Sequence, residues 1–391
     1  MKATSNGALE HAAGRDPKEM SRPTASTRKG FMESQGCGMQ VVCTARVALD
    51  MGLPIYGIVA FTGTSSDKIG RSVPAPGKGL MVHAAEARSA FLSPFLDIKF
   101  RRRQLMTRLD MIKVYEDAER RLIEDELEAM KSADSSFDVD AYRAHRTAHI
   151  NHEVTRQKAD ALDSLGNTFW KNHPEIAPMR GALATWGLTI DDLSVCSFHG
   201  TSTIMNERNE CDVLQRELAH LGRAKGNRIL GVFQKYLTGH PKGAAGAWMI
   251  NGGLQILQTS LVPGNRNADN VDSELEKFDY IAFPNQAIQT TGVKAFQVFS
   301  FGFGQKGAQA ITVHPKYLFA ALEDEEFELY RGKVVKRQRA ALRAFNKGFL
   351  ENRLFVAKDK APFAGNGEKE MDAMLNPGSR VEMEKDGHLL G

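Results

Sequence analysis

Three basic residues, His199, Lys235 and His240, stand where side chains can do chemistry. Each lies among glycine, small and hydroxyl residues close behind an apolar run, which is how a fold presents polar groups at the end of a strand. Two imidazole N–H donors beside an ammonium group can stabilise the negative charge that develops on an enolate oxygen. We therefore interpret these three residues as the catalytic candidates of a reaction that passes through an enolate.

Other interpretations of the two histidines are weaker. A metal site would need an HxxxH or HxH pair or a nearby carboxylate cluster, and neither accompanies His199 or His240, so no metal is predicted. A satisfied structural histidine remains the alternative for either residue taken alone. The hydroxyls of Thr201 and Thr203 suit the amides of an extended substrate arm, with a hydrogen-bonded turn as the alternative.

The elements that must position these residues alternate between strands and helices. Strands are expected at 193–198, 229–233, 293–300 and 308–313, and helices at 206–221 and 244–257. Nearer the N-terminus, a strand is expected at 39–45, a short helix at 46–51 and a buried strand at 54–61. This alternation indicates an α/β fold.

Residues 82–180 have a different character, since Glu, Lys, Arg, Ala and Leu dominate them. Helical spacing at 111–131 and 141–165 predicts a charged helical excursion whose polar faces are solvated or meet a partner subunit. After residue 317 the chain is again charged and helical, and it ends in a polar tail.

The composition excludes several classes of function. Hydrophobic residues make up 42% and charged residues 25% of the 391 residues, and the net charge of +4 argues for neither nucleic acid nor membrane as a partner. Four cysteines without metal or disulfide spacing, and a polar N-terminus, predict a cytoplasmic protein. The segment Gly302–Gly307 matches G-x-G-x-x-G, but a strand rather than a helix is expected after it, so no dinucleotide site is predicted.

The motifs of this chain resemble those of a known family. His199-Gly200-Thr201-Ser202-Thr203, the segment 235–246 and Ser300-Phe301-Gly302-Phe303-Gly304 are similar, in this order, to the signature of β-ketoacyl synthases. The longer segments 71–79, 233–243 and 263–270 resemble the ketoacyl synthase region of the α subunits of fungal type I fatty acid synthases.

The resemblance implies a thiolase-like fold with α/β/α/β/α layers. Residues 1–81 would end the first half of that fold, and 82–180 would form a charged helical insertion. Residues 181–317 would form a nearly complete second half with the histidine and lysine motifs, and 318–391 a helical and linker tail.

The activity that the resemblance implies is a decarboxylative Claisen condensation of an acyl thioester with malonyl-acyl carrier protein in fatty acid biosynthesis. His199 and His240 would assist the loss of carbon dioxide, and Lys235 would orient or tune them. Glu210 would help to hold the site, and Phe301 would be a gating aromatic whose backbone N–H contributes to an oxyanion hole.

The resemblance also implies substrate contacts and partners. Thr201 and Thr203 would contact the phosphopantetheine of acyl carrier protein, and the region itself would bind no cofactor. Expected partners are acyl carrier protein, the fatty acid synthase β subunit and a second ketoacyl synthase region, forming a homodimer within a larger hetero-oligomer. Two alternatives stay open: a non-catalytic assembly module of the synthase shell, and a synthase subunit that makes a starter acyl chain for polyketide biosynthesis.

The sequence departs from the family pattern at the nucleophile. Family members carry an active-site cysteine that accepts the acyl chain as a thioester. None of the four cysteines stands in the matching context, and each is interpreted as a structural thiol: Cys37, Cys43, Cys196 and Cys211. We therefore expect a fragment that begins after the nucleophile and does not condense by itself. Met249 stands where many bacterial relatives have Glu, which leaves the acidic partner of Lys235 open.

Overall fold

The computed structural model describes residues 9–67, 76–87, 89–302, 304–355, 364–375, 382–383 and 389–390. The chain divides into two compact units: the larger comprises Met1–Gln40 and Tyr56–Leu318, and the smaller Val41–Ile55 and Phe319–Gly391. Most of the sequence motif at 71–79 lies outside the described residues, as does Phe303. The candidate residues with described positions all belong to the larger unit.

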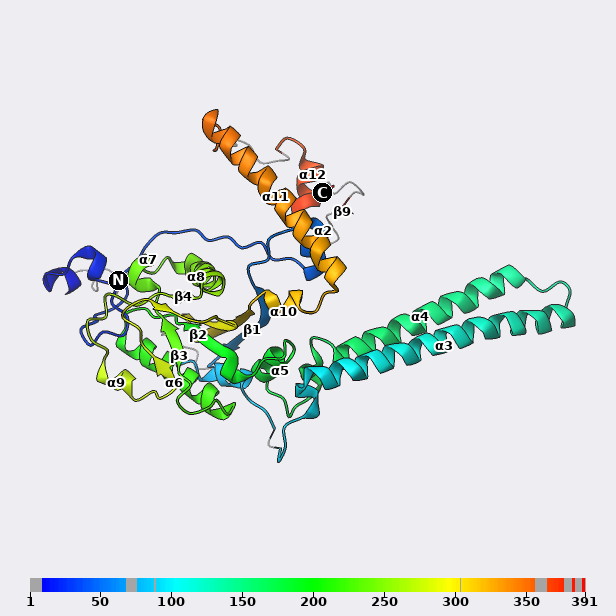
Figure 1. The fold of residues 1–391 in the computed structure, drawn as a ribbon, viewed down its shortest axis with the longest axis horizontal. Coiled ribbons are helices and arrows are strands. Elements are labelled where there is room, and N and C mark those ends of the chain that lie inside the picture. Colours follow the sequence, from blue (N-terminus) through cyan, green and yellow to red (C-terminus); the bar gives the residue numbers. More distant parts are fainter. Residues whose placement is uncertain are drawn as a thin grey trace. The chain divides into compact units, whose positions relative to one another are not determined.

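A six-stranded mixed sheet forms the centre of the larger unit (Figure 1). Its order is β1 (Ile58–Ser66), β8 (Lys306–Val313), β7 (Ala295–Gly302), β2 (Leu193–Ser197), β3 (Ile229–Val232) and β5 (Ile281–Ala282). Strands β7, β2, β3 and β5 run parallel, whereas β8 pairs antiparallel with β7 and β1. The four strands expected around the motifs are thus confirmed. The strand β8 begins within the last two residues of the G-x-G-x-x-G segment, so a strand and not a helix comes after it, as expected.

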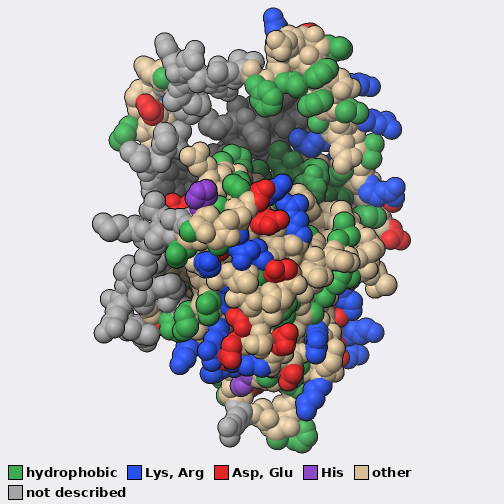
Figure 2. Space-filling view, turned by 90° about the vertical axis from the view of Figure 1, so that its left-hand side faces the viewer, with side chains coloured by type: hydrophobic (Ala, Val, Ile, Leu, Met, Phe, Trp, Pro, Cys, Tyr) green, Lys and Arg blue, Asp and Glu red, His purple; other side chains and the backbone are tan. Residues whose placement is uncertain are grey.

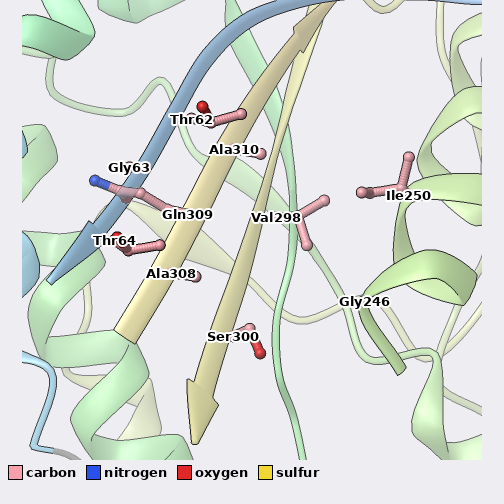
Figure 3. Close-up of a pocket in the computed structure, with 10 residues that line it drawn as sticks. All are labelled: Thr62, Gly63, Thr64, Gly246, Ile250, Val298, Ser300, Ala308, Gln309 and Ala310. Carbon is pink, nitrogen blue, oxygen red and sulfur yellow. The ribbon is translucent and has the colours of Figure 1, made fainter. Parts of the chain in front are cut away.

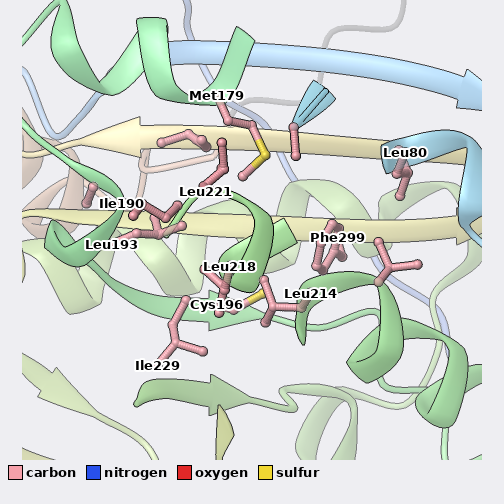
Figure 4. Close-up of a cluster of buried hydrophobic side chains, with 14 of the residues drawn as sticks. Leu80, Met179, Ile190, Leu193, Cys196, Leu214, Leu218, Leu221, Ile229 and Phe299 are labelled. Carbon is pink, nitrogen blue, oxygen red and sulfur yellow. The ribbon is translucent and has the colours of Figure 1, made fainter. Parts of the chain in front are cut away.

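Helices cover both faces of this sheet. On one face lie α5 (Pro178–Ala184) and α6 (Ile204–His220), and on the other lies α8 (Ala245–Thr259) (Figure 1). Successive side chains of a strand point to opposite faces of the sheet, so one strand packs against helices on both sides. In β2, Cys196 packs with α6 and its neighbour Val195 packs with α8. Figure 4 shows the core on the α6 side, where Leu214 and Leu218 meet the sheet.

Helix α8 approaches β7 very closely. A Cβ at Gly253 would lie 2.2 Å from Cε2 of Phe296, a distance that no side chain tolerates. Glycine at this position has a low helix propensity, but it permits the close contact between the helix and the sheet. The close approach therefore packs the middle of α8 against β7.

The charged excursion forms a helical hairpin of α3 (Ile98–Ala133) and α4 (Val139–Leu165), which run side by side (Figure 1). Asp97 and Asp138 cap the two helices by accepting backbone N–H bonds. The seam buries Ile112, Ile123, Leu127, Ile150, Val154 and Ala161. Arg146 joins the helices through Glu119 and Glu126 at 3.2 and 3.1 Å.

Shorter elements complete the described chain. The larger unit also contains α7 (Lys235–Thr238), α9 (Ser273–Glu276), β4 (Leu261–Val262) and β6 (Ile288–Gln289), and α10 (Lys316–Phe319) reaches its end. The smaller unit contains α2 (Ala45–Met51), α11 (Asp324–Leu350), α12 (Gly367–Leu375), β9 (Glu382–Met383) and β10 (Leu389–Leu390). Within it, Tyr330 of α11 is buried, and its hydroxyl donates to the Leu53 carbonyl at 2.9 Å.

Two expectations near the N-terminus were wrong. Residues 39–44 form no strand, and Met39, Val41 and Val42 are 76–82% exposed. A strand needs a neighbour for its backbone groups, and no described strand pairs with this run. The expected strand at 54–61 instead begins at Ile58 and extends to Ser66, because β8 pairs with it along that length.

The surface is of mixed charge. On the face drawn in Figure 2, Lys and Arg side chains are interspersed with Asp and Glu over the described part of the chain. None of the described helices combines the length and the apolar character that a bilayer crossing requires.

The seam of the α3–α4 hairpin provides a stability prediction. Ile150 is fully buried, so Ile150→Ala should destabilise the hairpin by about 2–5 kcal/mol through lost burial and a residual cavity. Hydrogen exchange of α3 and α4 amides, followed by mass spectrometry, measures this loss. Leu162→Ala is the matched control, since Leu162 on the same helix is 52% exposed. Equal effects of the two substitutions would show that this seam does not hold the hairpin together.

Candidate active site

The candidate residues emerge from the same edge of the sheet. His199 lies two residues beyond the end of β2, and Lys235 opens α7 shortly after β3 ends. Because β2 and β3 are parallel neighbours, their carboxyl ends meet at one edge, where ligands of α/β sheets commonly bind. The N–H of Phe198 donates to the Val232 carbonyl at 2.9 Å, which continues the pairing up to His199.

The two imidazoles face each other. Nε2 of His199 lies 3.4 Å from Nε2 of His240, and the ring centroids are 5.0 Å apart with an interplanar angle of 85°. The backbone N–H of Lys242 donates to Nδ1 of His240 at 3.1 Å. This bond makes Nδ1 the acceptor, so the proton of the neutral His240 ring is on Nε2, the atom nearest to His199.

Both imidazoles are held in the neutral form. Burial, assisted by the charge of Lys235 and by the other histidine, places the pKa of His199 well below its ordinary value. Burial also lowers the pKa of His240 to about 4, with further contributions from Lys235 and Lys242. At neutral pH the pair therefore acts through N–H groups and lone pairs rather than as imidazolium cations.

The ammonium group of Lys235 lies directly behind this pair. Its side chain is almost fully buried, and Nζ donates to the backbone carbonyl of His199. The sulfur of Met249 lies 3.3 Å from the same nitrogen. Met249 thus contacts Lys235 at the position where many bacterial relatives have a glutamate. Burial lowers the pKa of Lys235 to about 8, against the opposing fields of Glu210 and Glu207.

Glu210 supports the turn that follows His199. Its carboxylate accepts the N–H of Gly200 at 3.0 Å, and the side-chain amide of Asn206 also donates to it. Gly200 adopts φ +45°, a left-handed conformation that favours glycine. Burial and the neighbouring Glu207 raise the pKa of Glu210 to about 8. The turn at Gly200 thus depends on a buried carboxyl group from α6.

A second buried carboxylate on α6 was not predicted from the sequence. Glu207 accepts the N–H of Thr24 at 2.8 Å and pairs with Nε of Arg28 at 2.8 Å, and Arg28 also contacts Asp272 at 2.9 Å. Burial raises the pKa of Glu207 to about 7, although Arg28 opposes the shift. The signal was present in the spacing, since Glu207 and Glu210 are one helical turn apart.

The segment of residues 21–34, which we call the N-terminal segment, is bonded to the candidate residues along its length. Its N–H groups at Arg22 and Gly30 donate to the hydroxyl and carbonyl of Ser202 at 3.0 and 2.9 Å. These bonds accompany a left-handed backbone at Ser202, with φ +62°. Further along, the N–H of His240 donates to the Met32 carbonyl at 2.7 Å. The backbones on both sides of the imidazole pair are thereby tied to one segment.

The predicted substrate-contact residues lie in different surroundings. The hydroxyls of Thr201 and Thr203 are 2.8 Å apart and hydrogen-bond to each other. Phe301, on β7, belongs to the hydrophobic core, where its ring packs near Phe299 and against Gly77. The structure therefore brings His199, Lys235, His240 and Glu210 together. They are linked by direct contacts or by the effects of their charges on one another's pKa values.

The four cysteines divide into two classes. Cys196 in β2 and Cys211 in α6 are fully buried, and burial raises the pKa of each thiol well above its ordinary value. Such thiols are poor nucleophiles, because the thiolate is the reactive form. Cys37 and Cys43 are exposed. Within the described ranges, no cluster of three or more His, Cys, Asp or Glu side chains is arranged to hold a metal ion.

A cavity of about 320 Å³ lies between α8 and the sheet (Figure 3). Its walls come from β1, β7, β8 and α8, with Thr62, Thr64 and Ser300 as hydroxyl-bearing members. The residues that line it do not include the two histidines. The candidate site is accordingly defined by the contacts of the imidazoles, and not by this cavity.

Comparison with known proteins agrees with the motifs. Residues 155–269 match the family described as beta-ketoacyl synthase, C-terminal domain. The chain is 58% identical over 389 residues to the fatty acid synthase subunit alpha of Penicillium patulum, covering 98% of this chain and 21% of that protein. The chain therefore contains a β-ketoacyl synthase C-terminal domain at residues 155–269. The corresponding subunit of Saccharomyces cerevisiae is 52% identical over 390 residues, covering 98% of this chain and 20% of that protein.

The chain spans about a fifth of the length of the curated relatives that it matches. Among solved structures, it resembles the noncanonical ketosynthase FabY from P. aeruginosa with a TM-score of 0.52 and 16% identity, over 97% of this chain and 44% of that one. This likeness concerns the fold alone. It confirms the expected thiolase-like α/β class for the ketoacyl synthase region.

A third buried carboxyl group on α6 belongs to a separate polar network. Glu217 is fully buried and accepts side-chain amide bonds from Gln297 and Gln309 at 3.5 and 3.3 Å. Gln309 Nε2 also lies 2.7 Å from Nδ1 of His83. Burial raises the pKa of Glu217 from its ordinary 4.5 to about 8, although the amide bonds oppose the shift.

This raised pKa predicts a pH dependence of stability. The folded chain keeps a proton on Glu217 that the unfolded chain releases above about pH 4.5, so the free energy of unfolding should fall as pH rises from 4.5 to about 8. Glu217→Gln should remove up to about 1.4 kcal/mol of this fall per pH unit. Urea denaturation at several pH values measures the slope. Glu276→Gln, at an exposed carboxyl group, is the control, and an unchanged slope in Glu217→Gln would contradict the prediction.

Proposed function

We propose that His199 and His240 form the decarboxylating half of the condensing site in a fatty acid synthase α subunit. The observation that carries this proposal is the pair of Nε2 atoms 3.4 Å apart at the edge where β2 and β3 end. The family match and the identity to fungal α subunits support the choice of reaction. The substrate would be a malonyl thioester, and the enolate left after loss of carbon dioxide would attack an acyl thioester, releasing its thiol and giving a β-ketoacyl thioester.

The decarboxylation step accounts for the need for two neutral donors. Cleavage of the bond between the methylene carbon and the carboxylate releases carbon dioxide and leaves an electron pair on the thioester enolate. The enolate oxygen then carries negative charge, which N–H donors placed in advance stabilise. His240 is suited to this role because the Lys242 N–H occupies Nδ1 and leaves the proton on Nε2.

In this proposal Lys235 and Glu210 act through the histidines. Lys235 holds the His199 backbone by its carbonyl, and its positive charge opposes protonation of both rings. Glu210 secures the turn at Gly200 directly after His199. Both residues would therefore orient and tune the pair without contacting the substrate.

The substrate arm and the partners extend the same proposal. The malonyl group would arrive on the phosphopantetheine of acyl carrier protein, with Thr201 and Thr203 facing the amides of the arm, and Phe301 would act as the gating aromatic. The β subunit of the synthase and a second ketoacyl synthase region would be the further partners. The support for these partners is the identity to α subunits of fungal fatty acid synthases.

We also propose that none of the four cysteines accepts the acyl chain. Cys196 and Cys211 are buried thiols with raised pKa values. Cys37 lies between Gly36 and Gly38 in a segment without regular secondary structure, and its carbonyl accepts the indole N–H of Trp248 at 2.8 Å. Condensation by this chain would then need an acyl-carrying thiol from another source.

The proposal predicts a selective loss of decarboxylation. His199→Ala and His240→Ala should each lower the rate of carbon dioxide release from malonyl-CoA by about 100-fold or more, because each removes a donor to the enolate oxygen. Release of labelled carbon dioxide from malonyl-CoA carrying ¹⁴C in the free carboxyl group measures the rate.

His314→Ala is the matched control for this experiment. His314 is also followed by Pro and Lys, and its Nδ1 accepts the Lys316 N–H at 3.0 Å, so it repeats the local geometry of His240 at another place. It should keep the wild-type rate. A wild-type rate in His240→Ala would contradict the proposal, whereas absence of decarboxylation by the wild-type chain would favour the assembly-module alternative.

The cysteine proposal has its own test. After incubation with ¹⁴C-labelled acyl-CoA, no hydroxylamine-sensitive label should remain on the chain, since Cys196 and Cys211 are buried and neither exposed cysteine stands in the sequence context of the family's nucleophile. A double substitution, Cys37→Ser with Cys43→Ser, is the control for adventitious reaction of the exposed thiols. Stable label on wild type that this double variant loses would overturn the proposal.

A further inference from the structure

One buried amide joins the N-terminal segment to the short helix that carries Lys235. Asn267 lies in the loop between β4 and α9 and is 6% exposed. Its Nδ2 lies 2.8 Å from the Ser21 carbonyl, 2.9 Å from the Lys18 carbonyl and 3.2 Å from the Tyr236 carbonyl. Three carbonyl groups from two distant parts of the chain therefore converge on one side-chain amide.

The helix α7 depends on such external contacts. It has four residues, so it makes few hydrogen bonds of its own, and helices this short are not stable by themselves. Its Lys235 carbonyl accepts the hydroxyl of Ser21 at 2.6 Å, and its Tyr236 carbonyl faces Asn267. Two successive carbonyls of α7 thus accept hydrogen bonds, one from Ser21 and one from Asn267, which itself donates to the Ser21 carbonyl.

The position of α7 determines where the second imidazole lies. Lys235 begins the helix, and Gly239 follows its end with φ +63°, which turns the chain into His240. A displacement of α7 would move His240 relative to His199, because only Gly239 separates His240 from the end of the helix. It would also admit water to a site whose imidazoles are neutral through burial.

We propose that Asn267 is a positioning residue that locks α7 to the N-terminal segment and thereby sets the contact between His199 and His240. The role of that contact in decarboxylation rests on the proposed function, whereas the positioning itself rests on the hydrogen bonds of Asn267. The residue touches no reacting atom in this account. It acts through the backbone of α7.

The same loop provides a matched control in Asn265. This asparagine is 3% exposed, and its Nδ2 donates to the Pro23 carbonyl at 2.6 Å. Its backbone N–H donates to the Pro284 carbonyl at 2.8 Å. Asn265 therefore binds the N-terminal segment as Asn267 does, with similar burial, but its side-chain amide bond does not go to α7.

The protonation of His240 reports the state of this site without any substrate. The charged and titratable groups that act on it are Lys235 on α7, Lys242 and Glu33 beside the ring, and His199 opposite, while burial is the largest cause of its low pKa. Hydration of the ring would raise its pKa from about 4 toward the ordinary 6.5. A general loss of stability, with the folded site intact, would leave the pKa unchanged.

The test compares Asn267→Ala with Asn265→Ala in the full 391-residue chain. Titration of ¹³C-labelled histidine by NMR, with the His240 signal assigned by His240→Ala, should show a pKa raised by about one pH unit or more in Asn267→Ala. Asn265→Ala should lower the melting temperature comparably and leave the His240 pKa at its wild-type value. An unchanged His240 pKa in folded Asn267→Ala, or an equal rise in Asn265→Ala, would overturn the inference.

A milder substitution keeps the test informative if Asn267→Ala does not fold. Asn267→Ser retains one hydroxyl donor and should give a smaller rise of the His240 pKa in the same direction, whereas no rise would count against the inference. Because the titration needs no malonyl substrate, its outcome is separate from that of the proposed function. Absence of decarboxylation in wild type would refute the proposed reaction and leave the positioning result as measured.

Discussion

The site depends on burying one ammonium group. An isolated buried charge is costly, so it must be met by hydrogen-bond acceptors or opposite charge. Lys235 finds the carbonyl of His199, the sulfur of Met249 and the field of the α6 carboxyl groups. The first of these contacts joins the ends of β2 and β3, and the same positive charge helps to keep both imidazoles neutral. A single buried cation therefore links the geometry of the site to its protonation.

The face of α6 that meets the sheet carries three buried carboxyl groups, of which Glu207 and Glu210 act on Lys235. Glu207, Glu210 and Glu217 are all fully buried, and burial raises the pKa of each. Their partners differ: Arg28 for Glu207, backbone and amide N–H groups for Glu210, and glutamine amides for Glu217. Such networks stabilise a site only when their polar groups are satisfied, which makes the site sensitive to the N-terminal segment that supplies Arg28.

The fold was largely predictable because apolar periodicity depends on local sequence. The runs at 193–198 and 229–233 were read as strands and became β2 and β3, and the charged spacing at 141–165 became α4. The run at 39–45 failed for a physical reason: strand propensity is realised only with a hydrogen-bonding neighbour, and no described strand pairs with it. Likewise, the helix at 206–221 was predicted without the burial of Glu207 and Glu217, since burial of a carboxyl group cannot be read from its own helix alone.

The histidines show which features of the site depend on local sequence and which depend on tertiary contacts. His240 and His314 are both followed by Pro and Lys, and in both the ring Nδ1 accepts the N–H two residues on. The sequence by itself determined this ring orientation and tautomer, because the contact spans three residues. Only the tertiary structure decided that His240, and not His314, meets His199, through the pairing of β2 with β3 and the anchoring of α7 by Ser21 and Asn267. Those contacts join residues more than 30 positions apart, and no local pattern encodes them.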